Sequence, residues 1–144
     1  MPRFRIADAP FDVADLRQGL LSPQAGAFAS FEGLVRDNNA GRAVEALSYE
    51  AYRALAETEG ERVIDEARKR FAIMDAACVH RIGRLQLGEL AVWVGVSAGH
   101  RDAAFAACRW IIDEVKARVP VWKHEHYAQG GAEWLHPAPP ENRR

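Results

Sequence analysis

An alternation of apolar residues that leads directly into a long helical pattern constrains this fold more than any other feature of the sequence. Between residues 90 and 98, aliphatic side chains occupy every second position: Leu90, Val92, Val94 and Val96. That period of two is typical of a β-strand with a buried face. Residues 101–118 then repeat apolar side chains at helical spacing, and Pro120 ends the helix because the residue before a proline avoids the α region. The pattern predicts a helix packed against a sheet.

The remaining patterns predict an α+β fold with mostly antiparallel strands and two long helices. The second long helix is expected from about residue 54 to 71, and Asp12 is a plausible N-cap for a short helix. Strand patterns cover residues 4–6, 27–35, 44–52, 77–82 and 121–126. Because only the polar loop 36–41 separates two of these strands, we expect 27–35 and 44–52 to form a hairpin.

The length of the chain indicates one domain. A chain of 144 residues is long enough for one ordinary domain and too short for two. We expect that domain to cover residues 1–136. Residues 137–144 contain three prolines, which remove backbone donors and block helix formation, so we expect a loose C-terminal tail.

Composition excludes several classes of protein. Nineteen Lys and Arg against twenty Asp and Glu give a net charge of −1, without the basic excess of a nucleic-acid-binding protein. No apolar run approaches the roughly 18 residues of a membrane span, and the N-terminus does not resemble a signal peptide. Cys78 and Cys108 lie in apolar stretches and cannot make a disulfide framework, which favours a reducing compartment. We expect a cytoplasmic protein that binds neither nucleic acid nor membranes.

The start of the helix at residue 101 is a candidate anion site. His100 and Arg101 follow a turn of small residues at a helix N-terminus, where free amide groups and the helix dipole favour an anion. An arginine in the first turn opposes the dipole, and a bound phosphate would explain its presence. The alternative is a solvated arginine beside a capping histidine.

Three further cations are candidate site residues. Lys116 lies in the last turn of the helix and Lys123 on the next extended segment, and a lysine beside another cation and an apolar wall has a lowered pKa that suits acid, base or nucleophilic chemistry. We expect Lys116, on a packed helix, to be held more firmly than Lys123. Arg36 ends a strand at Leu34 and Val35. The alternatives are two surface lysines and an arginine paired with Asp37.

A zinc site is a weaker alternative. His124 and His126 share one face of a strand and, with Glu125 or His136, present ligands that zinc accepts. The compact spacing of usual metal motifs is absent from the sequence, and both cysteines are typical of core residues. We therefore expect neither a metal nor a cofactor.

Four segments together resemble the catalytic (large) subunit of molybdopterin synthase. They are FEGLVRDNNAG at 31–41, LSYEAY at 47–52, HRIGRLQLGELAVWVGVSAGHRDAAFAACR at 80–109 and DEVKARVPVWKHE at 113–125. The resemblance implies an α/β-hammerhead-type fold and a sulfurtransferase of molybdenum cofactor biosynthesis. Such enzymes convert a cyclic pyranopterin monophosphate, precursor Z, into molybdopterin by inserting the two dithiolene sulfurs.

The resemblance also implies partners and site residues. Sulfur arrives as a thiocarboxylate on the C-terminal Gly-Gly of a small ubiquitin-like carrier, and a central homodimer with two carriers forms a heterotetramer. The family's catalytic lysines match Lys116 and Lys123. Its substrate-binding positions match both lysines together with Leu34, Val35, Arg36, His100, Arg101, His124 and Glu125. His124 stands where the family often has a permanently basic residue.

Two other function classes remain as alternatives. The alternatives are a non-catalytic phosphate-binding or scaffold subunit and a small metal-dependent hydrolase that uses His124, Glu125 and His126.

Arg101 and Lys116 are fifteen residues apart on one helix, which separates them by roughly 22 Å at 1.5 Å per residue. That separation is about twice the length of the pterin. We therefore predict a composite site in which Lys116 and Lys123 come from one subunit and His100 and Arg101 from its partner.

Overall fold

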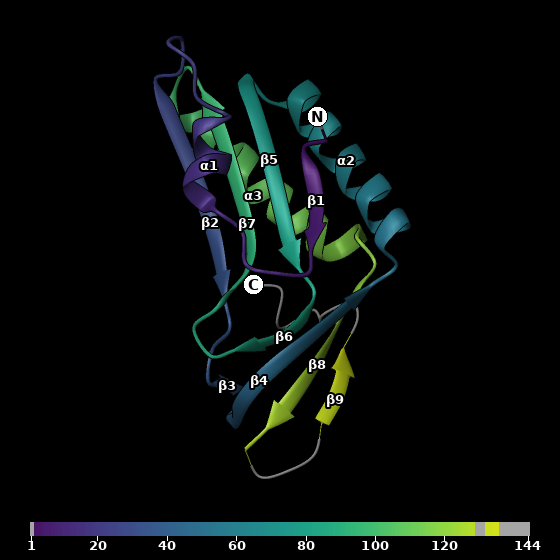
Figure 1. Cartoon of the computed structure of the whole chain (residues 1–144). Coiled ribbons are helices and arrows are strands. Elements are labelled where there is room, and N and C mark those ends of the chain that lie inside the picture. Colours follow the sequence, from purple (N-terminus) through teal and green to yellow (C-terminus); the bar gives the residue numbers. More distant parts are fainter. Residues whose placement is uncertain (1, 129–131, 136–144) are drawn as a thin grey trace.

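The computed structural model describes residues 2–128 and 132–135, and it divides into two sheets (Figure 1). The first sheet has the strand order β1 (Phe4–Ala7), β5 (Ile73–Arg81), β7 (Leu90–Ala98) and β2 (Ala27–Leu34). Only its β1–β5 pair is parallel, among the described strands. The predicted mostly antiparallel α+β fold is confirmed.

Three helices cover the first sheet. The two long helices, α2 (Arg53–Arg70) and α3 (Arg101–Arg118), lie on one face, and the short helix α1 (Val13–Gln18) lies on the other (Figure 1). The predicted cap of α1 is confirmed, because the Asp12 side chain accepts a hydrogen bond from the Asp15 amide at 3.2 Å. Among the described helices, none is long and apolar enough to cross a membrane.

The predicted alternation is confirmed in β7, and it divides the core into two layers. Val92, Val94 and Val96 are buried against the layer of α2 and α3, whereas Trp93 packs with residues of the α1 layer. Trp93 is 1% exposed, and its indole lies where a side chain at position 95 would extend. Gly95 is therefore required for this packing, since a Cβ there would lie 2.2 Å from the ring.

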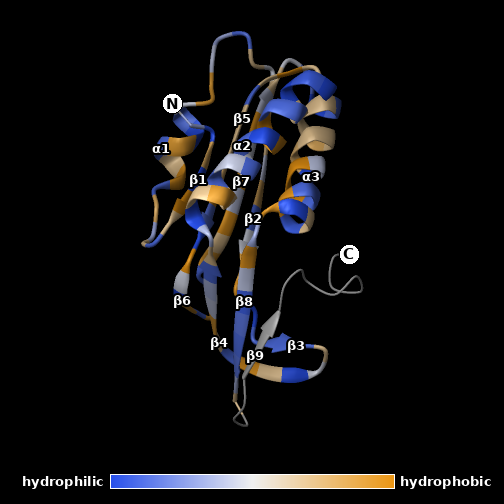
Figure 2. Cartoon of the chain, turned by 90° about the vertical axis from the view of Figure 1, so that its right-hand side faces the viewer, coloured by the Kyte–Doolittle hydropathy of each residue, from blue (hydrophilic) through white to orange (hydrophobic). Residues whose placement is uncertain are grey.

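The second sheet carries the more polar strands. Its order is β3 (Asn38–Asn39), β4 (Arg42–Ala51), β8 (Val121–Tyr127) and β9 (Ala132–Leu135), and β6 (Gly83–Gln86) also pairs with β4. Figure 2 shows hydrophilic residues along much of β4 and β8. A small cluster joins this sheet to the end of the first one; it consists of Val35, Val44, Leu47, Leu85, Ala91 and Tyr127, with Tyr49 packed against them.

The predicted hairpin between residues 27–35 and 44–52 is wrong. β2 pairs with β7 along its whole length, and β4 pairs with β8 in the other sheet. Pairing with β7 places apolar residues of β2 under α3, in the main core cluster. This arrangement buries more apolar surface than an isolated two-stranded hairpin would bury. The chain leaves the first sheet at a register shift between Gly33 and Leu34, and the polar loop then carries it to the second sheet.

Candidate functional site

Three cations from separate parts of the chain meet where the two sheets join. Lys116 lies in the last turn of α3, Lys123 lies on β8, and Arg36 follows the end of β2. Their mutual electrostatic effects place them together: Arg36 acts on both lysines, and Lys116 acts on Lys123. We call this group the cation cleft. The sequence could mark each residue, but only the fold assembles them.

Both lysines of the cation cleft have lowered pKa values. For Lys116, partial removal of water around the ammonium is the main cause of the lowered pKa, and the positive charge of Arg36 adds to it, against the attraction of Asp113. For Lys123, burial again comes first in lowering the pKa; Glu125 opposes it, and the other two cations reinforce it. Each lysine is therefore easier to deprotonate than a free one.

The greater firmness expected of Lys116 relative to Lys123 stays a prediction, and the two side chains differ in exposure. Lys116 is solvent-exposed in the last turn of α3, although the helix itself is packed. Lys123 is half-buried and lies between its neighbours on both sides, opposite Tyr49 on β4 and Leu135 on β9. Lys123 is therefore the more enclosed of the two side chains.

None of the three cations has a hydrogen bond or an ion pair with another described residue. Arg36 is exposed, and the alternative pairing with Asp37 does not form, since Asp37 accepts a hydrogen bond from the Asn38 amide at 2.9 Å instead. Cations that repel one another without a carboxylate in contact form a site for an anion, because a bound negative charge relieves that repulsion.

A buried carboxylate lies on the same strand face as Lys123. Glu125 is 3% exposed, and one of its oxygens accepts hydrogen bonds from the Asn39 amide at 2.7 Å and the Tyr127 hydroxyl at 3.1 Å. The structure thus brings Glu125 close enough to Lys123 for its charge to oppose the lowering of the lysine pKa.

His124 lies on the opposite strand face, because successive residues of a strand alternate. Its ring is 4.7 Å from that of His126, and His126 Nε2 is 3.1 Å from the Ser48 hydroxyl. The predicted zinc set of His124, His126 and Glu125 is therefore not assembled, and no cluster of three metal-binding side chains occurs among the described residues. His136 lies outside those residues.

The other predicted positions differ in their burial and in their place in the fold. Val35 is 3% exposed and contributes to the core between the sheets, whereas Leu34 is 57% exposed. His100 and Arg101 are both exposed at the N-terminus of α3, the end away from Lys116. His100 is the N-cap residue, but its side chain makes no capping hydrogen bond, so the alternative role of a capping histidine is wrong.

Two residues that sequence reasoning passed over border the cleft. His80, near the end of β5, feels the charge of Lys116, and Tyr49 is the cross-strand neighbour of Lys123. The two rings contact each other edge to face, with centroids 4.9 Å apart. A signal for the site was available in the composition, because the chain has only three lysines against sixteen arginines and two of the three lie in the cleft.

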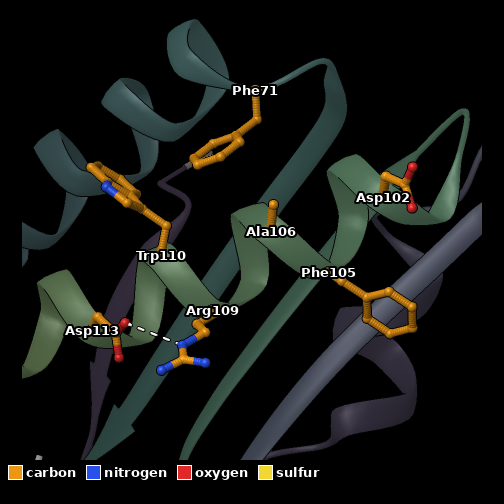
Figure 3. A pocket seen from close by; sticks show the side chains of 7 residues that line it. All are labelled: Phe71, Asp102, Phe105, Ala106, Arg109, Trp110 and Asp113. Carbon is orange, nitrogen blue, oxygen red and sulfur yellow. Dashed lines mark ion pairs between the residues drawn. The ribbon is translucent and has the colours of Figure 1, made fainter.

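A separate apolar depression lies on the outer side of α3 (Figure 3). Phe71 and Trp110 pack edge to face there at 5.9 Å, and Arg109 pairs with Asp113 at 3.6 Å. Phe105 projects to the side and is 65% exposed. None of the predicted site residues lines this depression, so it is distinct from the cation cleft.

Comparisons with known proteins agree on one family. Residues 6–118 match the family model described as MoaE protein. The molybdopterin synthase catalytic subunit of Thermoplasma volcanium is 45% identical over 129 residues, covering 90% of this chain and 94% of that protein.

Solved structures agree with the sequence match. Molybdopterin synthase from Staphylococcus aureus is similar with a TM-score of 0.86 and 34% identity, covering 94% of this chain and 98% of that one. A protein–protein complex of subunits 1 and 2 of the molybdopterin-converting factor from Helicobacter pylori shares the fold, with a TM-score of 0.74, 20% identity and coverage of 92% and 90%.

Proposed function

Since the chain belongs to the MoaE family of molybdopterin synthase catalytic subunits, we propose that its cation cleft performs the sulfur transfer that makes the dithiolene of molybdopterin. The substrate is the cyclic pyranopterin monophosphate, and the sulfur donor is the C-terminal thiocarboxylate of a small ubiquitin-like carrier. The observation that carries the proposal is the meeting of three unpaired cations, Arg36, Lys116 and Lys123, within the described structure.

Both reactants suit that site. The thiocarboxylate and the phosphate are anions, and each neutralises repulsion within the cleft. Every transfer replaces one carbon–oxygen bond of the pterin side chain with a carbon–sulfur bond, and the displaced oxygen leaves as water or as the freed oxygen of the cyclic phosphate. Water then cleaves the acyl–sulfur bond, so that the sulfur stays on the pterin and the carrier leaves as a carboxylate. Charge develops on oxygen and sulfur in both steps, where fixed ammonium groups are most effective. The lowered pKa values of Lys116 and Lys123 also make both ammonium groups readier to give up a proton than the ammonium of a free lysine.

A reaction with purified components tests this function. The chain is incubated with precursor Z and thiocarboxylated carrier, and dithiolene product is measured. A carrier that lacks its last two glycines is the matched control, because it keeps the docking surface but cannot reach the lysines. Product from the full carrier and none from the shortened one is expected. Absence of product with the full carrier, or full activity with the shortened one, contradicts the proposal.

The partner subunit and the compartment belong to the same proposal. A carrier subunit is supported by the family, and the Helicobacter pylori protein of the same fold is a complex of two subunits. Both cysteines of this chain are free and buried, which fits the reducing cytoplasm.

The distribution of site residues along α3 supports a shared site in a homodimer. Arg101 begins α3 and Lys116 lies in its last turn, which separates them by roughly 22 Å along the axis. That is about twice the length of the substrate. We infer that His100 and Arg101 of one subunit complete the cleft formed by Lys116 and Lys123 of the other, since a two-fold axis brings opposite helix ends together. The assembly with two carriers is then a heterotetramer.

Complementation tests the shared site. Inactive Lys116→Ala and inactive Arg101→Ala proteins are mixed and allowed to exchange subunits. A mixed dimer contains one intact site and one doubly altered site, so partial activity should return. If mass spectrometry confirms exchange and activity stays absent, the two motifs do not share a site across the dimer.

A further inference from the structure

The imidazole of His80 is fixed in position and in tautomer. Its Nδ1 is 2.8 Å from the carbonyl oxygen of Arg81, and since a carbonyl only accepts, Nδ1 carries the proton and donates. The edge-to-face contact with Tyr49 holds the plane of the ring. His80 therefore presents Nε2 as a bare acceptor, and Nε2 has no hydrogen-bond partner among the described residues.

His80 also stays uncharged at the pH of the reaction. Its pKa is lowered to about 4, mainly by burial; the hydrogen bond to Arg81 opposes this change, and the charge of Lys116 adds to it. On the second sheet, the neighbouring Tyr49 stays protonated, because burial and the charge of Glu125 raise its pKa to about 12. The ring pair therefore adds no charge to the cleft.

The same ring pair connects the two lysines. His80 occupies the helix-covered face of β5, on the side of α3 that carries Lys116. Tyr49 lies opposite Lys123 in the β4–β8 register. Lys116 is exposed, ends a flexible stem with four rotatable bonds, and lacks a partner in the described structure, so its ammonium is free to turn towards the ring pair.

We propose that His80 is a positioning residue of the cation cleft, whose Nε2 accepts a hydrogen bond from the Lys116 ammonium and aligns it with Lys123, while Tyr49 holds the imidazole in place. This inference rests on the proposed function for its effect on turnover, but not for its effect on Lys116 itself. A neutral acceptor suits the task, because a carboxylate there would neutralise the lysine and weaken its hold on an anion.

The direct test is the pH dependence of lysine acylation, read by mass spectrometry on the free protein. His80→Phe keeps a ring against Tyr49 and removes the acceptor, whereas His80→Gln keeps an acceptor. A hydrogen bond to the ammonium raises a lysine pKa, so His80→Phe should lower the pKa of Lys116 and His80→Gln should restore part of it. Lys69 is exposed on α2 and is the internal control. The other charged groups near the lysines, Arg36, Asp113 and Glu125, are the same in all the variants.

Turnover gives the second readout. His80→Phe should lower kcat about 10-fold with little change in KM, as expected for a misaligned catalytic group, and the alkaline limb of its pH–rate profile should move to lower pH. Thermal unfolding of each variant verifies that the fold is intact. An unchanged Lys116 pKa in folded His80→Phe overturns the proposal, and so does a lowered pKa with normal turnover. Failure of the wild-type protein to form dithiolene contradicts the proposed function instead, and leaves the acylation result standing.

Discussion

Two groups of charged residues lie near the C-terminal end of α3, and they differ in whether carboxylates neutralise the positive charge. Arg118 donates to three carboxylates, at 2.9 Å to Glu59, at 2.6 Å to Glu66 and at 3.3 Å to Glu114. Lys116, two residues earlier, has two cations, Arg36 and Lys123, and one carboxylate, Asp113, as charged neighbours among the described residues. Arg118 and its carboxylates link α2 to α3, whereas the cations of the cation cleft repel one another.

The difference between the two groups separates a structural role from a ligand-binding role. A cation surrounded by carboxylates has no remaining capacity to bind an anion, and its removal affects the packing of the helices. Cations without a carboxylate in contact lower the stability of the fold through their mutual repulsion. A negatively charged ligand removes that repulsion when it binds, and so stabilises the folded protein. Each of the following changes alters one of these two groups and leaves the other intact.

The largest effect is expected from the lysines of the cation cleft. Lys116→Ala and Lys123→Ala should each lower dithiolene formation by about 10²- to 10³-fold, the loss typical of a missing charge-stabilising group. Neither variant should be less stable, because each removes repulsion and breaks no ion pair within the described structure. Lys69→Ala is the matched control, with wild-type activity and stability. Near-normal product formation by either cleft variant would show that the lysine is not catalytic.

An intermediate effect is expected from the carboxylate-bound cation. Arg118→Ala should lower the free energy of unfolding by about 1–2 kcal/mol, because a partly buried guanidinium leaves three carboxylates facing one another. Turnover per folded molecule should stay within about 2-fold of wild type. Urea unfolding measures the change, and Arg109→Ala, which breaks an exposed pair with Asp113, should cost about 0.5 kcal/mol or less.

The pH dependence sharpens this second prediction. The hydrogen bond from Arg118 is the main cause that lowers the pKa of Glu66 below its ordinary value of 4.5. A carboxyl with a lowered folded-state pKa contributes stability that is present above its unfolded pKa and is lost as the pH falls through the folded value. The stability gap between wild type and Arg118→Ala should therefore be full at pH 7 and narrow below about pH 4.5. A gap that is constant down to pH 3 would mean that packing, and not charge, makes the difference.

The smallest effect is expected from Arg36. Its positive charge is one of the causes that lower the pKa values of Lys116 and Lys123, so Arg36→Gln should raise both pKa values slightly. Acylation of the three lysines across pH measures this directly, and Lys69 should not change. Identical values in wild type and variant would show that Arg36 does not belong to the cation cleft.

The sequence was sufficient for the elements of the fold and insufficient for how they pair. The alternation at 90–98 and the helical pattern at 101–118 each depend on nearby residues, and both were predicted within a residue or two. The pairing of β2 with β7 depends on which distant strand buries more apolar surface, and neither strand carries that information alone. The hairpin was predicted because adjacent strands usually pair, and the two-sheet arrangement overrode that preference.

The site shows the same division. Lys116, Lys123 and Arg36 were identifiable by residue type and by resemblance, but their convergence depends on the packing of α3, β8 and the end of β2. His80 and Tyr49 were not identified, because a histidine at the end of an apolar strand and a tyrosine in an alternating one both read as core residues. The opposite orientations of Glu125 and His124 follow from strand alternation, once the strand is known.

The register between β4 and β8 has a consequence for how this protein tolerates change. Lys123 pairs with Tyr49 and Glu125 pairs with Leu47, and these two residues of β8 share one face of the strand. Inserting or deleting one residue between Val119 and Lys123 would turn the strand over and present His124 and His126 to the cleft in place of the lysine and the carboxylate. The ammonium and the carboxylate would then be replaced by two imidazoles. Length variation is therefore forbidden in this short connection, which makes the number of residues there as much a determinant of activity as their identity.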